Sequence, residues 1–167
     1  SQLDADQYRR ILCSNHFKAD AKALREEVAT FAVKVATELI DPDCLEAYVA
    51  CRLIPLNKNP GIRPIGVGEV LRRIVGKSIA WALREEVQAA AGPLQMSSGL
   101  QGGAEAAIHS MREIFNMESS DAVILIDAAN AFNNLNIMVA LHNIQYICPP
   151  LATTLINTYR QPSRLFL

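Results

Sequence analysis

A single acid, Asp127, follows an apolar run in the sequence DAVILIDAANAFNNLN. The run predicts a strand over Ala122–Ile126 that is central in a sheet, because it is unbroken in apolarity. A carboxylate at a strand end can bind Mg²⁺, which prefers oxygen ligands. One carboxylate is not a complete site, since enzymes with two metal ions need several acidic oxygens, usually from more than one strand. On spacing alone, Asp127 is about equally well explained as the N-cap of the next helix.

The second candidate for chemistry is a basic stretch, residues 52–77. It carries six Lys and Arg residues against one acid, Glu69, whereas the whole chain has a net charge of −1. Such a stretch can meet the phosphates of nucleic acid. An ordinary solvated face explains a single charge run equally simply. The six bases are Arg52, Lys58, Arg63, Arg72, Arg73 and Lys77.

A short hairpin must position the first of these bases. Two strands are predicted, Arg52–Leu56 and Ile62–Val67, because a cluster of Asn, Pro and Gly separates two apolar runs. A proline inside each run, Pro55 and Pro64, confines the strands to a sheet edge or to irregular pairing.

Helical periodicity accounts for most of the remaining chain, and we expect an α+β fold with helices packed on a small sheet. Asp20 is a plausible N-cap for the first long helix, which should end before Asp41-Pro42. Gly92-Pro93 should end the second, and Leu94–Gly103 should be a loop. Helices are predicted over residues 20–40, 69–91, 104–115 and 135–147 and from Pro149 to about Arg160, with a further short turn over residues 45–50.

Composition narrows the class of protein. Half of the residues are apolar and a fifth are charged, as in globular domains. No apolar run approaches the roughly 18–20 residues that span a bilayer, and the polar, acidic start predicts no secretory signal. Four cysteines without CxxC spacing and three scattered histidines do not favour zinc or disulfides, so we expect an intracellular protein, cytoplasmic or nuclear. The sequence stops at QPSRLFL just as another apolar run begins, which leads us to expect a portion of a longer protein.

The order of these features resembles the first half of a reverse transcriptase, an RNA-directed DNA polymerase, of the kind found in LINE-like retroelements. RLIPLNKNPGIRPIGVGEVLRRIVGKSI resembles the fingers motif of that family, in which a Lys/Pro/Gly turn precedes Arg-Pro-Ile and a helix. QMSSGLQGGAEAAIHSM resembles its glutamine-and-glycine segment, and LIDAANAFNNLN resembles its first palm motif, Asp-x-x-x-Ala-Phe-Asp. The resemblance covers about residues 50–167.

The resemblance implies roles at the nucleotide. Asp127 would be the first catalytic aspartate and would bind both metal ions, Mg²⁺ or Mn²⁺. Phe132 would be the gate that excludes a ribose 2′-hydroxyl, although a Phe in the core is a common alternative. Lys58 and Arg63 would reach the triphosphate of the incoming dNTP, unless both are solvated hairpin charges. Asn133 stands where the family often has a second aspartate, which is not a metal ligand.

Other residues would contact nucleic acid. Arg73 and Lys77, four apart on one helix face, are the better phosphate candidates. Arg72 lies on another face, so we expect a surface role for it, and the three bases should not all meet one strand. Gln101, Gly102 and Gly103 would let the backbone approach the template, although a plain loop and helix start explains them almost as well.

Three functions follow from these observations. The first is a polymerase fragment with three parts, a helical segment over residues 1–50, a fingers-like region over 51–118 and a partial palm over 119–167. Its partners would be RNA template, DNA or RNA primer and dNTPs. We expect the isolated chain to be inactive, because the paired aspartates of the later palm motif are absent before Leu167. The second is a nucleic-acid-binding module without chemistry, and the third is a structural relic. An incomplete sheet could also drive self-association. A hydrolase is disfavoured, because no serine has a nucleophile-elbow context.

Overall fold

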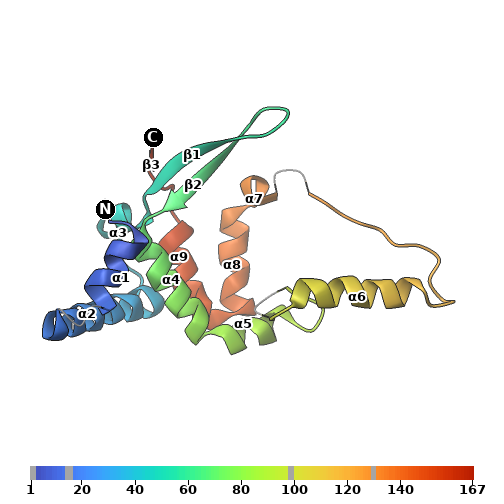
Figure 1. Ribbon diagram of the computed structural model, residues 1–167, viewed down its shortest axis with the longest axis horizontal. Helices are drawn as coiled ribbons and strands as arrows, with labels where there is room; N and C mark the ends of the chain where they lie inside the picture. The colour runs from blue at the N-terminus through green and yellow to red at the C-terminus, as the bar shows by residue number, and fades with distance from the viewer. Residues whose placement is uncertain (1–2, 14–16, 98–99, 129–130) are drawn as a thin grey trace.

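The computed structural model is rich in helices and has one small sheet, the α+β class that the sequence predicts (Figure 1). It describes residues 3–13, 17–97, 100–128 and 131–167, without the side chains of residues 132 and 133. The helices are α1 (Ala5–Cys13), α2 (Lys18–Thr37), α3 (Pro42–Val49), α4 (Val70–Ala82), α5 (Arg84–Ala91), α6 (Gly103–Phe115), α7 (Ala131–Asn134), α8 (Ile137–Ile147) and α9 (Pro149–Tyr159). The strands are β1 (Cys51–Asn57), β2 (Ile62–Gly68) and β3 (Leu165–Phe166).

The core lies where α2 packs against α4 and α9. Its buried centre is formed by Val35 of α2 with Val75 and Ile79 of α4. Val35 belongs to an apolar stripe at helical spacing in the sequence of the first long helix, formed by Leu24, Val28, Phe31, Val35 and Leu39. Asp20 is not the N-cap of that helix, because α2 already begins at Lys18 and Asp20 lies in its first turn. The predicted helix, residues 20–40, therefore differs from α2 at both ends, by two residues at its start and by three at its end.

The predicted hairpin is present. β1 and β2 pair antiparallel, and Pro55 lies directly opposite Pro64. β3 adds to the far side of β1 in parallel, but it pairs only with Cys51 and Arg52 at the base of the hairpin. Beyond those two residues, β1 has β2 as its only strand neighbour among the described residues. The prolines therefore lie in a two-stranded ribbon, as the missing N–H of proline requires.

The helix predicted over Glu69–Ala91 is two helices, so this prediction is wrong in one respect. The break is at Leu83, which ends α4 and precedes α5. Leu83 packs against the buried core cluster, and its N–H still donates to Ile79 O at 2.9 Å. The apolar stripe continues through both helices, so periodicity alone does not reveal the bend.

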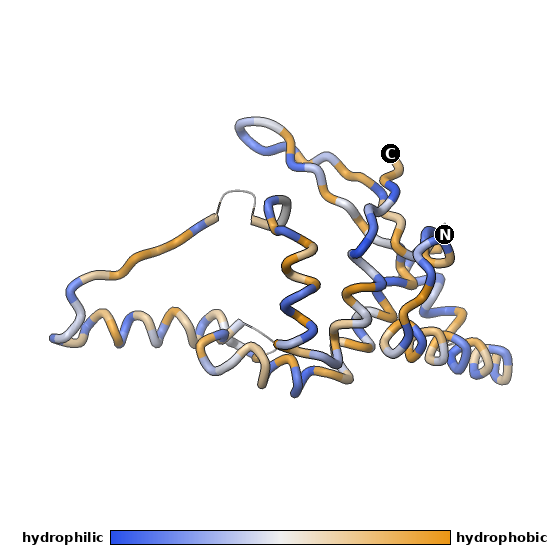
Figure 2. Tube along the Cα trace, turned by 180° about the vertical axis from the view of Figure 1, so that it is seen from behind, coloured by the Kyte–Doolittle hydropathy of each residue, from blue (hydrophilic) through white to orange (hydrophobic). Residues whose placement is uncertain are grey.

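The predicted central strand Ala122–Ile126 is not a strand. In the structure this segment is extended but belongs to no sheet, and Ile124, Leu125 and Ile126 are 84%, 89% and 91% exposed. Together with α6 it forms an arm that projects from the helical body and returns towards α7 (Figure 1). Figure 2 shows the apolar run along this arm as a continuous orange stretch. The apolar pattern predicted that this segment is buried. Burial requires another helix or strand to pack against the segment, and none of the described elements covers Ile124, Leu125 and Ile126.

All four cysteines are free thiols. Over the described residues, no helix combines the length and the apolar character needed to cross a bilayer.

Candidate nucleic-acid interface

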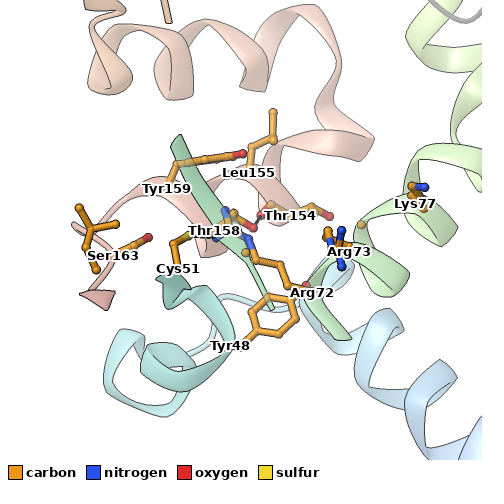
Figure 3. A pocket seen from close by; sticks show the side chains of 14 residues that line it. Tyr48, Cys51, Arg72, Arg73, Lys77, Thr154, Leu155, Thr158, Tyr159 and Ser163 are labelled. Atoms are coloured by element: carbon orange, nitrogen blue, oxygen red, sulfur yellow. Dashed lines mark hydrogen bonds between the residues drawn. The ribbon is translucent and has the colours of Figure 1, made fainter. Parts of the chain in front are cut away.

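A cleft of about 690 Å³ lies between α4, α9 and the base of the hairpin (Figure 3). Its volume is within the range of small-molecule and cofactor sites. Three of its side chains are basic, and no carboxylate is among the described residues that line it. The lining residues are Tyr48, Cys51, Gly66, Gly68, Arg72, Arg73, Gly76, Lys77, Thr154, Leu155, Thr158, Tyr159, Ser163 and Leu165.

Arg72 is held in place by contacts on three sides. Its Nη1 donates to Val49 O at 3.0 Å and contacts Cys51 Sγ at 3.4 Å. Its guanidinium carbon lies 5.5 Å from the centroid of the Tyr159 ring, a cation–π distance. The side chain is half-buried, so Arg72 is not the solvated surface charge that the sequence predicts. It joins α4 to the end of α3 and to α9.

Arg73 and Lys77 are exposed and also line the cleft. Their spacing of four residues puts them on one face of α4, as predicted. Arg72 lines the same cleft although it lies on another face of α4, since the cleft spans more than one helix face. The expectation that the three bases do not all meet one strand of nucleic acid stays a prediction. Three cations thus meet at one cleft wall without a lining carboxylate to neutralise them.

Tyr48 also lines the cleft, beside Arg72 (Figure 3). Its ring packs edge-on against Phe31, with the two centroids 5.2 Å apart. Burial raises the pKa of the Tyr48 hydroxyl above its usual value of 10.0, and the charge of Arg72 acts in the opposite direction. The phenol therefore stays neutral in the folded protein at physiological pH.

The two hairpin cations lie elsewhere. Lys58 and Arg63 are exposed on the hairpin, which projects from the body (Figure 1), and neither lines the cleft. The main-chain N–H of Lys58 donates to Gly61 O at 2.9 Å and closes the turn. The structure therefore separates the predicted dNTP-binding cations from Arg73 and Lys77, and their role at a triphosphate stays a prediction.

Asp127 is exposed on the projecting arm. It is not the N-cap of the next helix, because α7 begins four residues later, at Ala131. Within the described part of the chain, no group of three His, Cys, Asp or Glu side chains could hold a metal ion. A role for Asp127 in binding Mg²⁺ or Mn²⁺ stays a prediction. Phe132 lies in α7, and its side chain is outside the described part of the structure.

The glutamine-and-glycine segment has a local structural explanation. Gly102 adopts a left-handed conformation, with φ 68°, as it leads into α6. Gly103 is buried, and a Cβ there would lie 1.8 Å from Met96 O, so only glycine fits. Gln101 is exposed in the turn before them. The loop and helix start thus account for both glycines, and a template contact by these residues stays a prediction.

Sequence reasoning missed the α9 side of the cleft. Thr154, Thr158 and Tyr159 line it together, because α9 presents these residues towards α4 and the hairpin base. A helix that places Thr154 and Thr158 four residues apart, among apolar neighbours, carries a weak signal of a polar strip on a buried face. Ser163 follows α9 in a segment without helical or strand pattern, and no sequence signal indicates its position.

No family model, no curated protein and no solved structure matches this chain.

Proposed function

We propose that this chain is the fingers and first palm portion of an RNA-directed DNA polymerase, and that by itself it binds single-stranded nucleic acid without polymerising. The proposal combines the ordered motifs of residues 50–167 with one structural observation. That observation is the cleft wall formed by Arg72, Arg73 and Lys77, which contains no lining carboxylate among the described residues.

Charge and geometry support binding to a phosphate backbone. Arginine presents a rigid fork of N–H donors to phosphate oxygens, whereas lysine acts as a flexible point charge. Arg72 is already ordered by Val49 and Tyr159, so less side-chain entropy is lost when it binds. Arg73 and Lys77 are exposed, so their side chains can adjust to the phosphate backbone of a flexible nucleic-acid strand.

The same geometry supports binding without chemistry in this chain. Asp127, the proposed catalytic aspartate, lies on an exposed arm without two further metal-binding side chains near it in the described residues. In-line attack by a primer hydroxyl requires two metal ions to position the attacking and leaving oxygens. We propose a catalytic role for Asp127, Lys58, Arg63 and Phe132, with Mg²⁺ or Mn²⁺ and dNTPs, only in a complete polymerase. The alternative of a non-catalytic binding module predicts the same behaviour for the isolated chain.

The test is binding of a fluorescent single-stranded RNA to the purified chain, measured by anisotropy at low salt. The double variant Arg73→Ala/Lys77→Ala should bind roughly tenfold more weakly, because two phosphate contacts are lost. The matched control is Lys22→Ala/Lys34→Ala, which removes two exposed lysines of α2 that lie outside the cleft lining.

The control should keep the affinity of the unaltered chain. Equal losses in the two double variants would mean that net charge alone determines binding, and the proposed interface would be wrong. Metal-dependent primer extension by the isolated chain, abolished by Asp127→Ala, would contradict the predicted lack of polymerisation.

A further inference from the structure

The hydroxyl of Thr154 is the least explained polar group of the cleft. Thr154 is 8% exposed, and its Oγ1 has no hydrogen-bond partner in the described structure. Its neighbour Thr158 is equally buried, but its hydroxyl donates to Thr154 O at 2.7 Å. A buried hydroxyl without a partner costs free energy, and such groups are uncommon in folded proteins. The Thr154 side chain lines the same cleft as Arg72 and Arg73 (Figure 3), so a ligand there could supply the missing partner.

The charge of the cleft exceeds the charge of one internal phosphate. An internal phosphodiester carries one negative charge, whereas a terminal phosphomonoester carries about −1.5 to −2 at neutral pH. Three cations line the cleft. Glu69, the one acid of residues 52–77, precedes Arg73 by four residues but is outside the described lining. A doubly charged phosphate therefore matches these cations better than a singly charged one.

Arg72 is oriented for such a group. Its polar contacts to Val49 O and to Cys51 Sγ both use Nη1. An arginine has five N–H donors, so the ordered guanidinium retains further donor capacity. The cleft wall also includes three glycines, Gly66, Gly68 and Gly76, which add no side-chain volume.

We propose that this cleft binds a phosphomonoester group, held by Arg72, Arg73 and Lys77 and completed by the Thr154 hydroxyl. The inference rests on the proposed function in that it concerns the same nucleic-acid-binding cleft, and it makes the phosphorylated end of a strand a preferred ligand. The same chemistry is present in a nucleoside monophosphate and in free phosphate, so the experiment must separate these sources.

The test compares two single-stranded RNAs of one sequence, one with a 5′-phosphate and one with a 5′-hydroxyl, each labelled at the 3′ end. The phosphorylated RNA should bind at least about fivefold more tightly to the unaltered chain at low salt. Thr154→Val keeps the shape of the side chain and removes its hydroxyl, so it should reduce the preference.

Gly76 offers a blocking variant with little risk to folding. A Cβ at this helical position meets no atom within 4 Å. Gly76→Glu should place a carboxylate on the cleft wall and abolish the preference, whereas Gly76→Ala should preserve it. Retained preference in Gly76→Glu would locate the phosphate elsewhere and overturn the proposal.

The outcomes separate this inference from the proposed function. Equal binding of the two RNAs would overturn the inference and leave the proposed function standing. Binding of neither RNA would contradict both. Competition with inorganic phosphate and with adenosine 5′-monophosphate identifies the kind of molecule whose phosphate the cleft binds. Displacement of the phosphorylated RNA by either compound supports a site for the phosphomonoester alone, and discrimination between the RNAs without displacement supports recognition of the strand end.

Discussion

The side-chain amide of Asn157 donates to Val35 O at 2.9 Å, which joins α9 to the end of α2 across 122 residues of sequence. The same nitrogen donates to Glu38 O at 2.7 Å, and the side-chain oxygen accepts from the N–H of Ile40 at 3.1 Å. Asn157 is 4% exposed. One buried amide therefore satisfies main-chain groups that the end of α2 would otherwise leave unpaired.

Asn157→Ala should lower the free energy of unfolding by about 2–4 kcal/mol, because it leaves buried main-chain groups without partners. Urea denaturation followed by circular dichroism measures this change. The control is Asn143→Ala, at an exposed position of α8, which should change stability by less than about 0.5 kcal/mol. Similar values for the two variants would show that the Asn157 contacts do not stabilise the α2–α9 packing.

Tyr48 should make stability sensitive to alkaline pH. Burial raises its pKa in the folded chain above the usual value of 10.0, with Arg72 opposing. As the pH rises past about 10, the Tyr48 hydroxyl loses its proton in the unfolded chain before it does so in the folded chain. Deprotonation then lowers the free energy of the unfolded state relative to the folded state, so the free energy of unfolding falls. The contribution of Tyr48 is fully present below that pH and is lost as the pH rises through the folded pKa.

Tyr48→Phe should therefore lose less stability than the unaltered chain between about pH 9 and pH 11. Urea denaturation at both pH values measures the difference. Tyr146→Phe is the control, since Tyr146 is 75% exposed. If both variants lose stability equally, burial of Tyr48 does not perturb its titration.

The exposed arm predicts tolerance to charge. Leu125→Lys should change the free energy of unfolding by less than about 0.5 kcal/mol, because Leu125 is 89% exposed. Leu45→Lys, at a position 2% exposed in α3, should lower stability by at least about 3 kcal/mol. A large loss of stability in Leu125→Lys would indicate that Ala122–Ile126 is buried.

The exposed apolar run should also drive self-association, so Leu125→Lys should reduce concentration-dependent light scattering.

Local signals explain what the sequence could predict. The Asn/Pro/Gly turn between two short apolar runs is sufficient for the hairpin, and the stripe containing Val35 is sufficient for α2. The bend at Leu83 could not be predicted, because the same stripe continues on both sides of it. The prediction of a central strand over Ala122–Ile126 was wrong for a different reason. An apolar pattern indicates what a segment prefers to contact, and only tertiary structure decides whether that contact exists.

The candidate site was half predictable. The spacing of Arg73 and Lys77 placed both on one face of α4, which the structure bears out. Arg72 was predicted on the surface, because its contacts with Val49 and Tyr159 come from segments distant in sequence. Thr154 could not be found as an unpaired hydroxyl, since its lack of a partner is a property of the packed structure.

The most direct test of the account is the salt dependence of single-stranded RNA binding by the unaltered chain. Each phosphate contact with a single strand contributes a slope of roughly −0.7 to log K against log salt, so three cleft cations predict a slope of about −2. Arg73→Ala/Lys77→Ala should reduce it to about −0.7. A slope near zero in the unaltered chain, or the same slope in the variant, would contradict a nucleic-acid interface at Arg72, Arg73 and Lys77.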